Sequence, residues 1–206
     1  LARHCVSRQS MSENPVSIVD LDIINPYFRS REASAELEKL GIKVLNPQGG
    51  QFYADLPIIL PEIKGAIKDR DGTIILDVGG DDSGARVLST LAEAFTPDNY
   101  ELMLVLNANR PFTSNVEGCI KMINEIETAS RLSFTGLIAN THLMDETTPD
   151  DIITGLNLAH KVSDKTKLPI RFLSITNEVL AKVSPDLFDV PVLPLNRSLL
   201  KPWEKQ

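Results

Sequence analysis

The sequence is poor in cysteine and in long apolar runs, and each shortage excludes a class of protein. Its 206 residues include only two cysteines, Cys5 and Cys119, too few for a disulfide framework or a cysteine metal site. No apolar stretch approaches the roughly 18 residues of a membrane span. No export signal is visible at the start of the chain. We therefore expect a cytoplasmic protein that does not act on a membrane.

Positive charge is also scarce. The chain has 21 lysines and arginines against 28 aspartates and glutamates, for a formal net charge of −7. The basic residues are scattered, and no run of them is dense enough to form a basic stripe. Because binding to phosphate backbones depends on such positive surfaces, nucleic acid is not an expected partner.

What the sequence does contain is an alternation of short apolar strands and helices. The predicted strands are Val16–Asp20, Ile42–Leu45, Thr73–Asp77, Leu102–Asn107, Thr135–Asn140, Ile170–Ile175 and Val190–Leu193. The predicted helices are Glu32–Leu40, Pro61–Lys68, Gly84–Phe95, Asn115–Arg131, Pro149–Lys165 and Glu178–Val183. Continuous apolar strands are typical of a sheet covered on both faces. The sequence thus predicts an α/β fold, with a mostly parallel sheet, helices on both faces and ligands at the carboxyl ends of the strands.

One domain is expected. A chain of 206 residues with 42% hydrophobic content is large enough for one sizeable core. No internal repeat, low-complexity tract or interdomain linker interrupts it. We expect residues 1–15 to be an irregular segment and residues 16–206 to form the single domain, with Gln48–Pro57 as its longest irregular stretch.

Two of the predicted strands end in carboxylates. Asp20 and Asp22 leave the first strand, and Asp77 ends the third, directly before Gly79-Gly80. Carboxylates at the end of a buried strand are costly unless a metal ion or another cation pairs with them. Acidic residues in this position hold Mg²⁺ in nucleotidases, and glycines after the strand would let a phosphate approach the backbone. The alternative is structural: Asp20 and Asp22 cap a helix or pair with nearby arginines, and Asp77 belongs to a helix-capping turn.

A candidate base-binding residue follows a third strand. Asn140-Thr141 ends the apolar segment Phe134–Ala139, and an asparagine amide can both donate to and accept from an adenine edge. The Lys-x-Asp that would favour guanine does not follow. Pro194–Ser198 is a second candidate wall of such a pocket. Asparagine at a strand end is also common turn chemistry. His4, His142 and His160 show no metal-ligand spacing, and we expect structural or surface roles for them.

The segment Ile18–Glu32, with its Asp-x-Asp-x-x-Asn-Pro-Tyr-Phe run, resembles the MinD/ParA/CobQ group of P-loop ATPases. The resemblance extends from about Val16 to the carboxyl terminus and implies a nucleotide partner, ATP, with Mg²⁺. It implies the following roles: Asp22 positions the hydrolytic water, Asp20 and Asp77 lie on the Mg²⁺ side, Gly80 senses the γ-phosphate, and Asn140 with Thr141 contacts adenine. It further implies a homodimer around nucleotide in the complete form and a protein client.

The chain departs from that group in one respect. No G-x-x-x-x-G-K-[ST] phosphate loop occurs in it, and only Leu1–Pro15 precede the first acidic strand. Without the loop lysine and its amides, several carboxylates would face a polyanion and repel it. We therefore expect an incomplete ATPase that binds ATP poorly by itself, in which the strands beside the lost strand expose apolar edges.

Two other functions remain open. A non-catalytic pseudo-ATPase could serve as a protein-binding module. Small-molecule ligase chemistry, as in the cobyrinate amidation relatives, has no separate glutaminase-like segment to support it.

Overall fold

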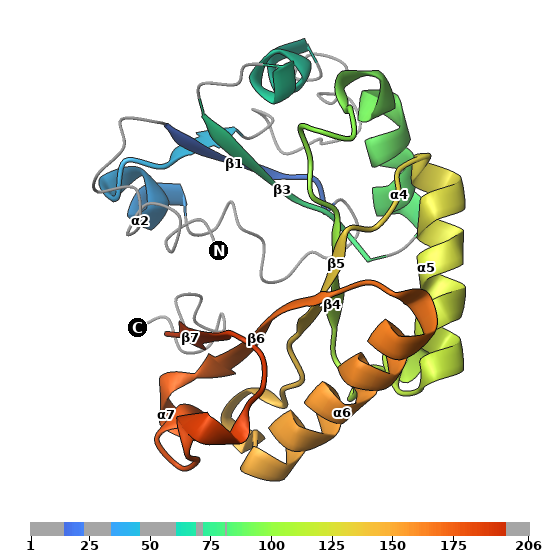
Figure 1. Ribbon diagram of the computed structural model, residues 1–206. Helices are drawn as coiled ribbons and strands as arrows, with labels where there is room; N and C mark the ends of the chain where they lie inside the picture. The colour runs from blue at the N-terminus through green and yellow to red at the C-terminus, as the bar shows by residue number, and fades with distance from the viewer. Residues whose placement is uncertain (1–14, 23–33, 46–60, 69–71, 81, 197–206) are drawn as a thin grey trace. The chain divides into compact units, whose positions relative to one another are not determined.

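The structure is a computed structural model that describes residues 15–22, 34–45, 61–68, 72–80 and 82–196. The chain divides into two compact units, the first made mainly of Leu1–Tyr100 and the second of Glu101–Thr128 with Leu132–Arg197. Each unit contains one wholly parallel sheet (Figure 1). The fold is therefore α/β, as the alternation of strands and helices predicts. The predictions for residues 1–14, 23–33 and 46–60 lie outside the described residues.

The first unit is built on a three-stranded sheet in the order β2-β1-β3. Its strands are β1 (Val16–Asp20), β2 (Lys43–Leu45) and β3 (Thr73–Asp77). Its helices are α2 (Ser34–Lys39), a helix over residues 61–68, and α4 (Asp82–Leu91), which continues into the 3-10 turn η2 (Ala92–Ala94). β1 is the central strand of this sheet, and most of its side chains are buried.

Successive side chains of β1 point to opposite faces of the sheet, and both faces are covered. Val19 and Leu21 are fully buried in a cluster with residues of the helix over 61–68 and of α4. Val16 and Ile18 pack in a second cluster with Leu37 of α2. The unit consequently has three layers, which is the arrangement that a continuous apolar strand favours.

The second unit is built on a four-stranded sheet in the order β4-β5-β6-β7. Its strands are β4 (Met103–Leu106), β5 (Gly136–Ala139), β6 (Ile170–Thr176) and β7 (Val192–Leu195). Its helices are α5 (Val116–Ser130), α6 (Pro149–Thr166) and α7 (Asn177–Leu180), with the 3-10 turns η3 (Pro111–Thr113), η4 (Met144–Glu146) and η5 (Pro185–Leu187). α6, the orange helix of Figure 1, packs on β5 and β6.

α6 begins where its sequence predicts. Thr148 Oγ1 accepts from the N–H of Asp151 at 3.3 Å, and the N–H of Thr148 donates to the Asp151 carboxylate at 2.8 Å. This reciprocal capping box satisfies amides at the start of a helix that have no partner within it. The helix ends at Thr166 and is followed by Lys167, whose backbone is left-handed with φ 65° and whose N–H donates to Ser163 O at 2.7 Å.

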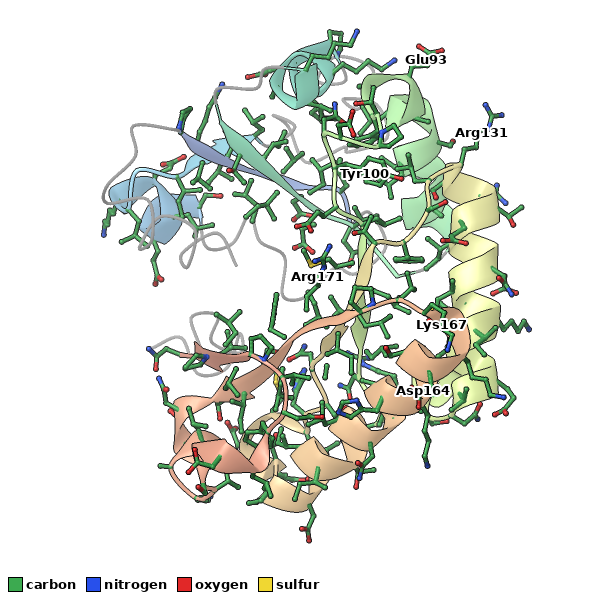
Figure 2. All side chains as sticks on the ribbon, in the orientation of Figure 1. Glu93, Tyr100, Arg131, Asp164, Lys167 and Arg171 are labelled. Atoms are coloured by element: carbon green, nitrogen blue, oxygen red, sulfur yellow. The ribbon has the colours of Figure 1, made fainter. Side chains whose placement is uncertain are left out.

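The amino-terminal end of this sheet carries an exposed ion pair. Arg171, labelled in Figure 2, places Nη2 2.8 Å from Glu101 Oε1. A Cβ added to Gly136, at the start of β5, would meet the Arg171 side chain at 2.7 Å, so the arginine stem lies over that glycine. The polar residues that could bind a ligand lie at the opposite, carboxyl end of the strands.

The structure corrects two expectations. The seven described strands form two separate sheets, whereas the sequence predicts one. The last strand runs from Val192 to Leu195, two residues later than predicted, and includes Pro194. Proline is tolerated in a strand that pairs on one side only, and among the described strands β7 pairs only with β6.

Candidate functional site

The carboxyl ends of β1 and β3 bring the predicted acidic residues together. Asp20 and Asp77 are register partners in the parallel β1–β3 ladder, and both are the last residues of their strands. The ladder continues one step further, since the N–H of Leu21 donates to Asp77 O at 2.7 Å. Asp22 follows directly, and its N–H donates to Asp20 Oδ1 at 3.1 Å. The sequence places these three carboxylates in two separate segments, and the fold gathers them at one edge.

The three carboxylates differ in their exposure to solvent. Asp20 is 2% exposed, Asp22 is half-buried, and Asp77 is exposed. Burying a carboxylate at a strand end costs free energy that a cation or hydrogen bonds must offset. The backbone N–H of Asp22 supplies one such hydrogen bond. The edge is thus a place of concentrated negative charge, suited to a cation and unsuited to a bare anion.

These residues fit a magnesium ion that is shared with phosphate. Within the described ranges, no group of three or more His, Cys, Asp or Glu side chains is arranged as a metal site. Mg²⁺ does not require one, because it keeps several waters and is usually held by one or two carboxylates together with substrate phosphates. Asp20 and Asp77, on adjacent strands, offer that number of protein ligands.

The glycines after β3 differ in how closely they are packed. A Cβ added to Gly84 would lie 2.1 Å from the carbonyl oxygen of Gly79, so no larger residue fits there without a shift of the backbone. Gly80 is exposed, and no atom of the described residues lies within 4 Å of the position that a Cβ would take. The backbone at Gly80 is therefore open to a ligand that approaches from solvent.

In the second unit, Thr141 is a packing residue at the end of β5. It is 2% exposed, and its Oγ1 accepts from the N–H of Ala108 at 2.9 Å. A Cβ added to Gly155 of α6 would meet this hydroxyl at 2.0 Å. Thr141 thereby ties the loop after β4 to the loop after β5, with α6 pressed against both.

Asn140 lies beside a residue that sequence reasoning missed. Ser174 of β6 is 5% exposed, and its Oγ lies 2.7 Å from Asn140 Oδ1 and 3.2 Å from the carbonyl oxygen of Ala139. Ser174 is separated from Asn140 by a helix and a loop in the sequence. Only the β5–β6 pairing, in which Ala139 is the register partner of Leu173, brings them together.

Each strand of the second sheet is followed by an asparagine. The four are Asn107 after β4, Asn140 after β5, Asn177 after β6 and Asn196 after β7. Asn107 is used internally, since its Nδ2 donates to His142 O at 3.2 Å and its Oδ1 accepts from the N–H of Asn109 at 3.0 Å. Asn177 Nδ2 donates to Asn196 Oδ1 at 2.7 Å. This repeated strand–asparagine junction is the sequence signal that would have extended the predicted base site to Asn177.

The residues expected to be structural have different environments. Cys119 is fully buried, and burial raises the pKa of its thiol to about 11. His142 is half-buried, and burial together with the nearby Arg110 lowers the pKa of its imidazole. His160 Nε2 lies 3.1 Å from Asp189 Oδ1 on an exposed surface.

A shallow hollow of about 390 Å³ lies between the start of α5 and α6, lined in part by Ser114, Asn157 and Lys161. None of the predicted site residues lines it.

Comparison with known proteins finds no matching family model and no matching curated protein. No helix within the described residues is long and apolar enough to cross a membrane.

Proposed function

We propose that this chain belongs to an ATP-binding, ATP-hydrolysing switch protein of the MinD/ParA/CobQ type. The observation that supports the proposal best is the pairing of Asp20 with Asp77 at the ends of adjacent parallel strands, with Asp22 directly beyond. Open parallel sheets bind ligands at this edge. A site with this much negative charge suits Mg²⁺ that is carried in with a nucleotide.

The proposal assigns a role to each predicted site residue at the carboxyl ends of the strands. Asp22 would orient the attacking water, Asp20 and Asp77 would support Mg²⁺, and Gly80 would admit the γ-phosphate. Bound Mg²⁺ would neutralise charge on the phosphates. Asn140 would contact the base. Thr141 would act indirectly, because its hydroxyl already serves the N–H of Ala108.

The proposal requires a phosphate-binding segment that these 206 residues do not contain. Two features are compatible with an added strand. Among the described strands, β3 pairs only with β1, and β4 pairs only with β5. Val105 of β4 is 53% exposed, although parallel strands are normally covered. An added parallel strand that leads into a phosphate loop would cover such an edge and bring the missing lysine.

The same proposal includes a homodimer around nucleotide, a protein client and a cytoplasmic location. The resemblance supports these parts of the proposal, and the acidic composition disfavours nucleic acid and anionic membranes as partners.

A pseudo-ATPase that binds another protein is the second candidate. The exposed apolar side chains of the second unit favour it, above all Phe112 at 78% exposure. Apolar side chains this exposed are found at protein-binding surfaces as well as singly on ordinary surfaces. This candidate predicts a stable protein whose melting temperature does not respond to MgATP.

Hydrolysis of MgATP by the native protein separates the two candidates. Under the proposal, Asp22→Asn lowers kcat by about 10²- to 10⁴-fold, the usual effect of losing a group that orients a proton or water, and leaves MgATP binding in place. Asp98→Asn, in an exposed loop, is the matched control and keeps full activity. A native protein that shows neither hydrolysis nor a MgATP-dependent rise in melting temperature would contradict the proposal.

A further inference from the structure

The hollow between the start of α5 and α6 is lined by one charge of each sign. Glu117 comes from α5 and Lys161 from α6, and both side chains are exposed. Among the described residues, neither of them is in an ion pair. The volume of about 390 Å³ lies in the range of small-molecule sites, roughly 300–1,000 Å³. Two opposite charges thus line one hollow of ligand size without neutralising each other.

The neighbours of the two charges on their own helices explain why both stay available. Lys121 lies one turn after Glu117, but its Nζ is 3.8 Å from Glu125 Oε1 on the other side. On α6, the residues that line the hollow before Lys161 include Thr154 and Asn157, which are neutral. Their spacing of three and four residues places them on one face of the helix with Lys161. A ligand therefore meets a cation beside polar neutral groups on α6 and an anion on α5.

The remaining lining is partly apolar. Ala108 of the loop after β4, Val116 of α5 and Leu158 of α6 contribute to it, and Leu158 is only 8% exposed. A ligand that matches the whole lining consequently carries a negative group, a positive group and a small apolar body.

We propose that this hollow binds a free α-amino acid with an apolar side chain, its carboxylate at Lys161 and its ammonium group at Glu117. The lysine ammonium and the Asn157 amide donate hydrogen bonds that a carboxylate accepts, and the Glu117 carboxylate accepts from an ammonium group. A ligand with a single charge leaves one of the two protein charges without a partner. The hollow contains none of the residues assigned to the nucleotide, so this site is separate from the proposed ATPase function.

Three forms of one amino acid test the proposal. L-Valine carries both charges, L-valinamide lacks the carboxylate and N-acetyl-L-valine lacks the ammonium group. Titrated into the full 206-residue chain at neutral pH, L-valine should give saturable changes in ¹H–¹⁵N spectra at the residues that line the hollow. Each analogue should bind about fivefold more weakly, the factor expected for one exposed ion pair. Equal affinities for the three compounds, or no saturable change with L-valine, would overturn the proposal.

Removal of either protein charge tests the assigned partners. Lys161→Met and Glu117→Gln should each weaken L-valine binding by about fivefold. Lys165→Met on α6 and Glu125→Gln on α5 are the matched controls, because both side chains are exposed and neither lines the hollow. L-Valine affinity that is unchanged in Lys161→Met or in Glu117→Gln would refute the site.

An exchange of the two charges distinguishes binding from a structural role. Lys161→Glu alone places two negative charges in the hollow and should abolish binding of L-valine. Adding Glu117→Lys restores one charge of each sign, so a zwitterion can bind the other way round and its affinity should return. Both positions are exposed, so the melting temperature should stay close to that of the unaltered chain. A double variant that folds but does not regain L-valine binding would contradict the proposal.

Discussion

The side chains at the strand ends depend on neighbours that lie far away in the sequence. Asp20 lies beside Asp77, and the Thr141 hydroxyl holds the N–H of Ala108. Such pairs arise from strand pairing, because parallel strands bring their carboxyl ends to one edge of the sheet. The chemistry of a candidate residue can therefore be predicted from the nearby sequence, but the residue that will lie beside it cannot.

His142 makes the stability of the protein depend on pH. Burial and the positive charge of Arg110 lower the pKa of its imidazole below the ordinary value of 6.5. The N–H of Met144 also donates to His142 Nδ1 at 3.4 Å, a contact that the neutral ring accepts. Below about pH 6.5 the unfolded chain binds a proton that the folded chain refuses, so the free energy of unfolding should fall as the pH drops.

Urea unfolding at pH 7.5 and pH 5.5 measures this dependence. His142→Gln should reduce the loss of stability between the two pH values, because the imidazole that differs between the folded and unfolded states is gone. His160→Gln removes an exposed histidine from the same unit and should retain the His142-dependent loss. An identical pH dependence in the native protein and His142→Gln would show that His142 is not the source.

Among the elements, α6 has the best-defined start. Thr148 and Asp151 exchange hydrogen bonds there, and the bond from Thr148 lowers the pKa of the Asp151 carboxyl. Thr148→Ala removes the side-chain acceptor and should cost about 1 kcal/mol of unfolding free energy. Thr128→Ala, at an exposed position late in α5, is the control and should change stability far less. Equal losses in the two variants would contradict the assigned cap.

Element positions could be predicted where a local signal marks the boundary. β1 and β3 have their predicted bounds because an apolar run ends at an aspartate in each. α6 has its predicted start because Thr148-Pro149 marks it. β7 was misplaced because Pro194 reads as a strand breaker, and only the strand order reveals that, among the described strands, β7 pairs on one side.

At the scale of the whole molecule, the sequence predicts the fold class but not the division of the sheet. The spacing and length of the apolar runs predict whether one or both faces of a strand are buried, and both can be seen within a short stretch of sequence. Which strands pair is decided by contacts between distant segments, such as Val16 with Thr73 and Leu137 with Ile170. The candidate site shows the same limit, since its acidic residues were predicted individually while Ser174 and Asn177 were missed.

We propose that the acidic edge of β1 and β3 acts on a nucleotide whose phosphates are held by a loop outside these 206 residues. The most direct test is the intact mass of the native protein, with sequencing of its amino-terminal peptide. We predict a mass several kilodaltons above 22.7 kDa and a peptide that contains Gly-Lys-Ser or Gly-Lys-Thr. A native protein of 22.7 kDa would contradict it, and Asp20, Asp22 and Asp77 would lose their assigned roles.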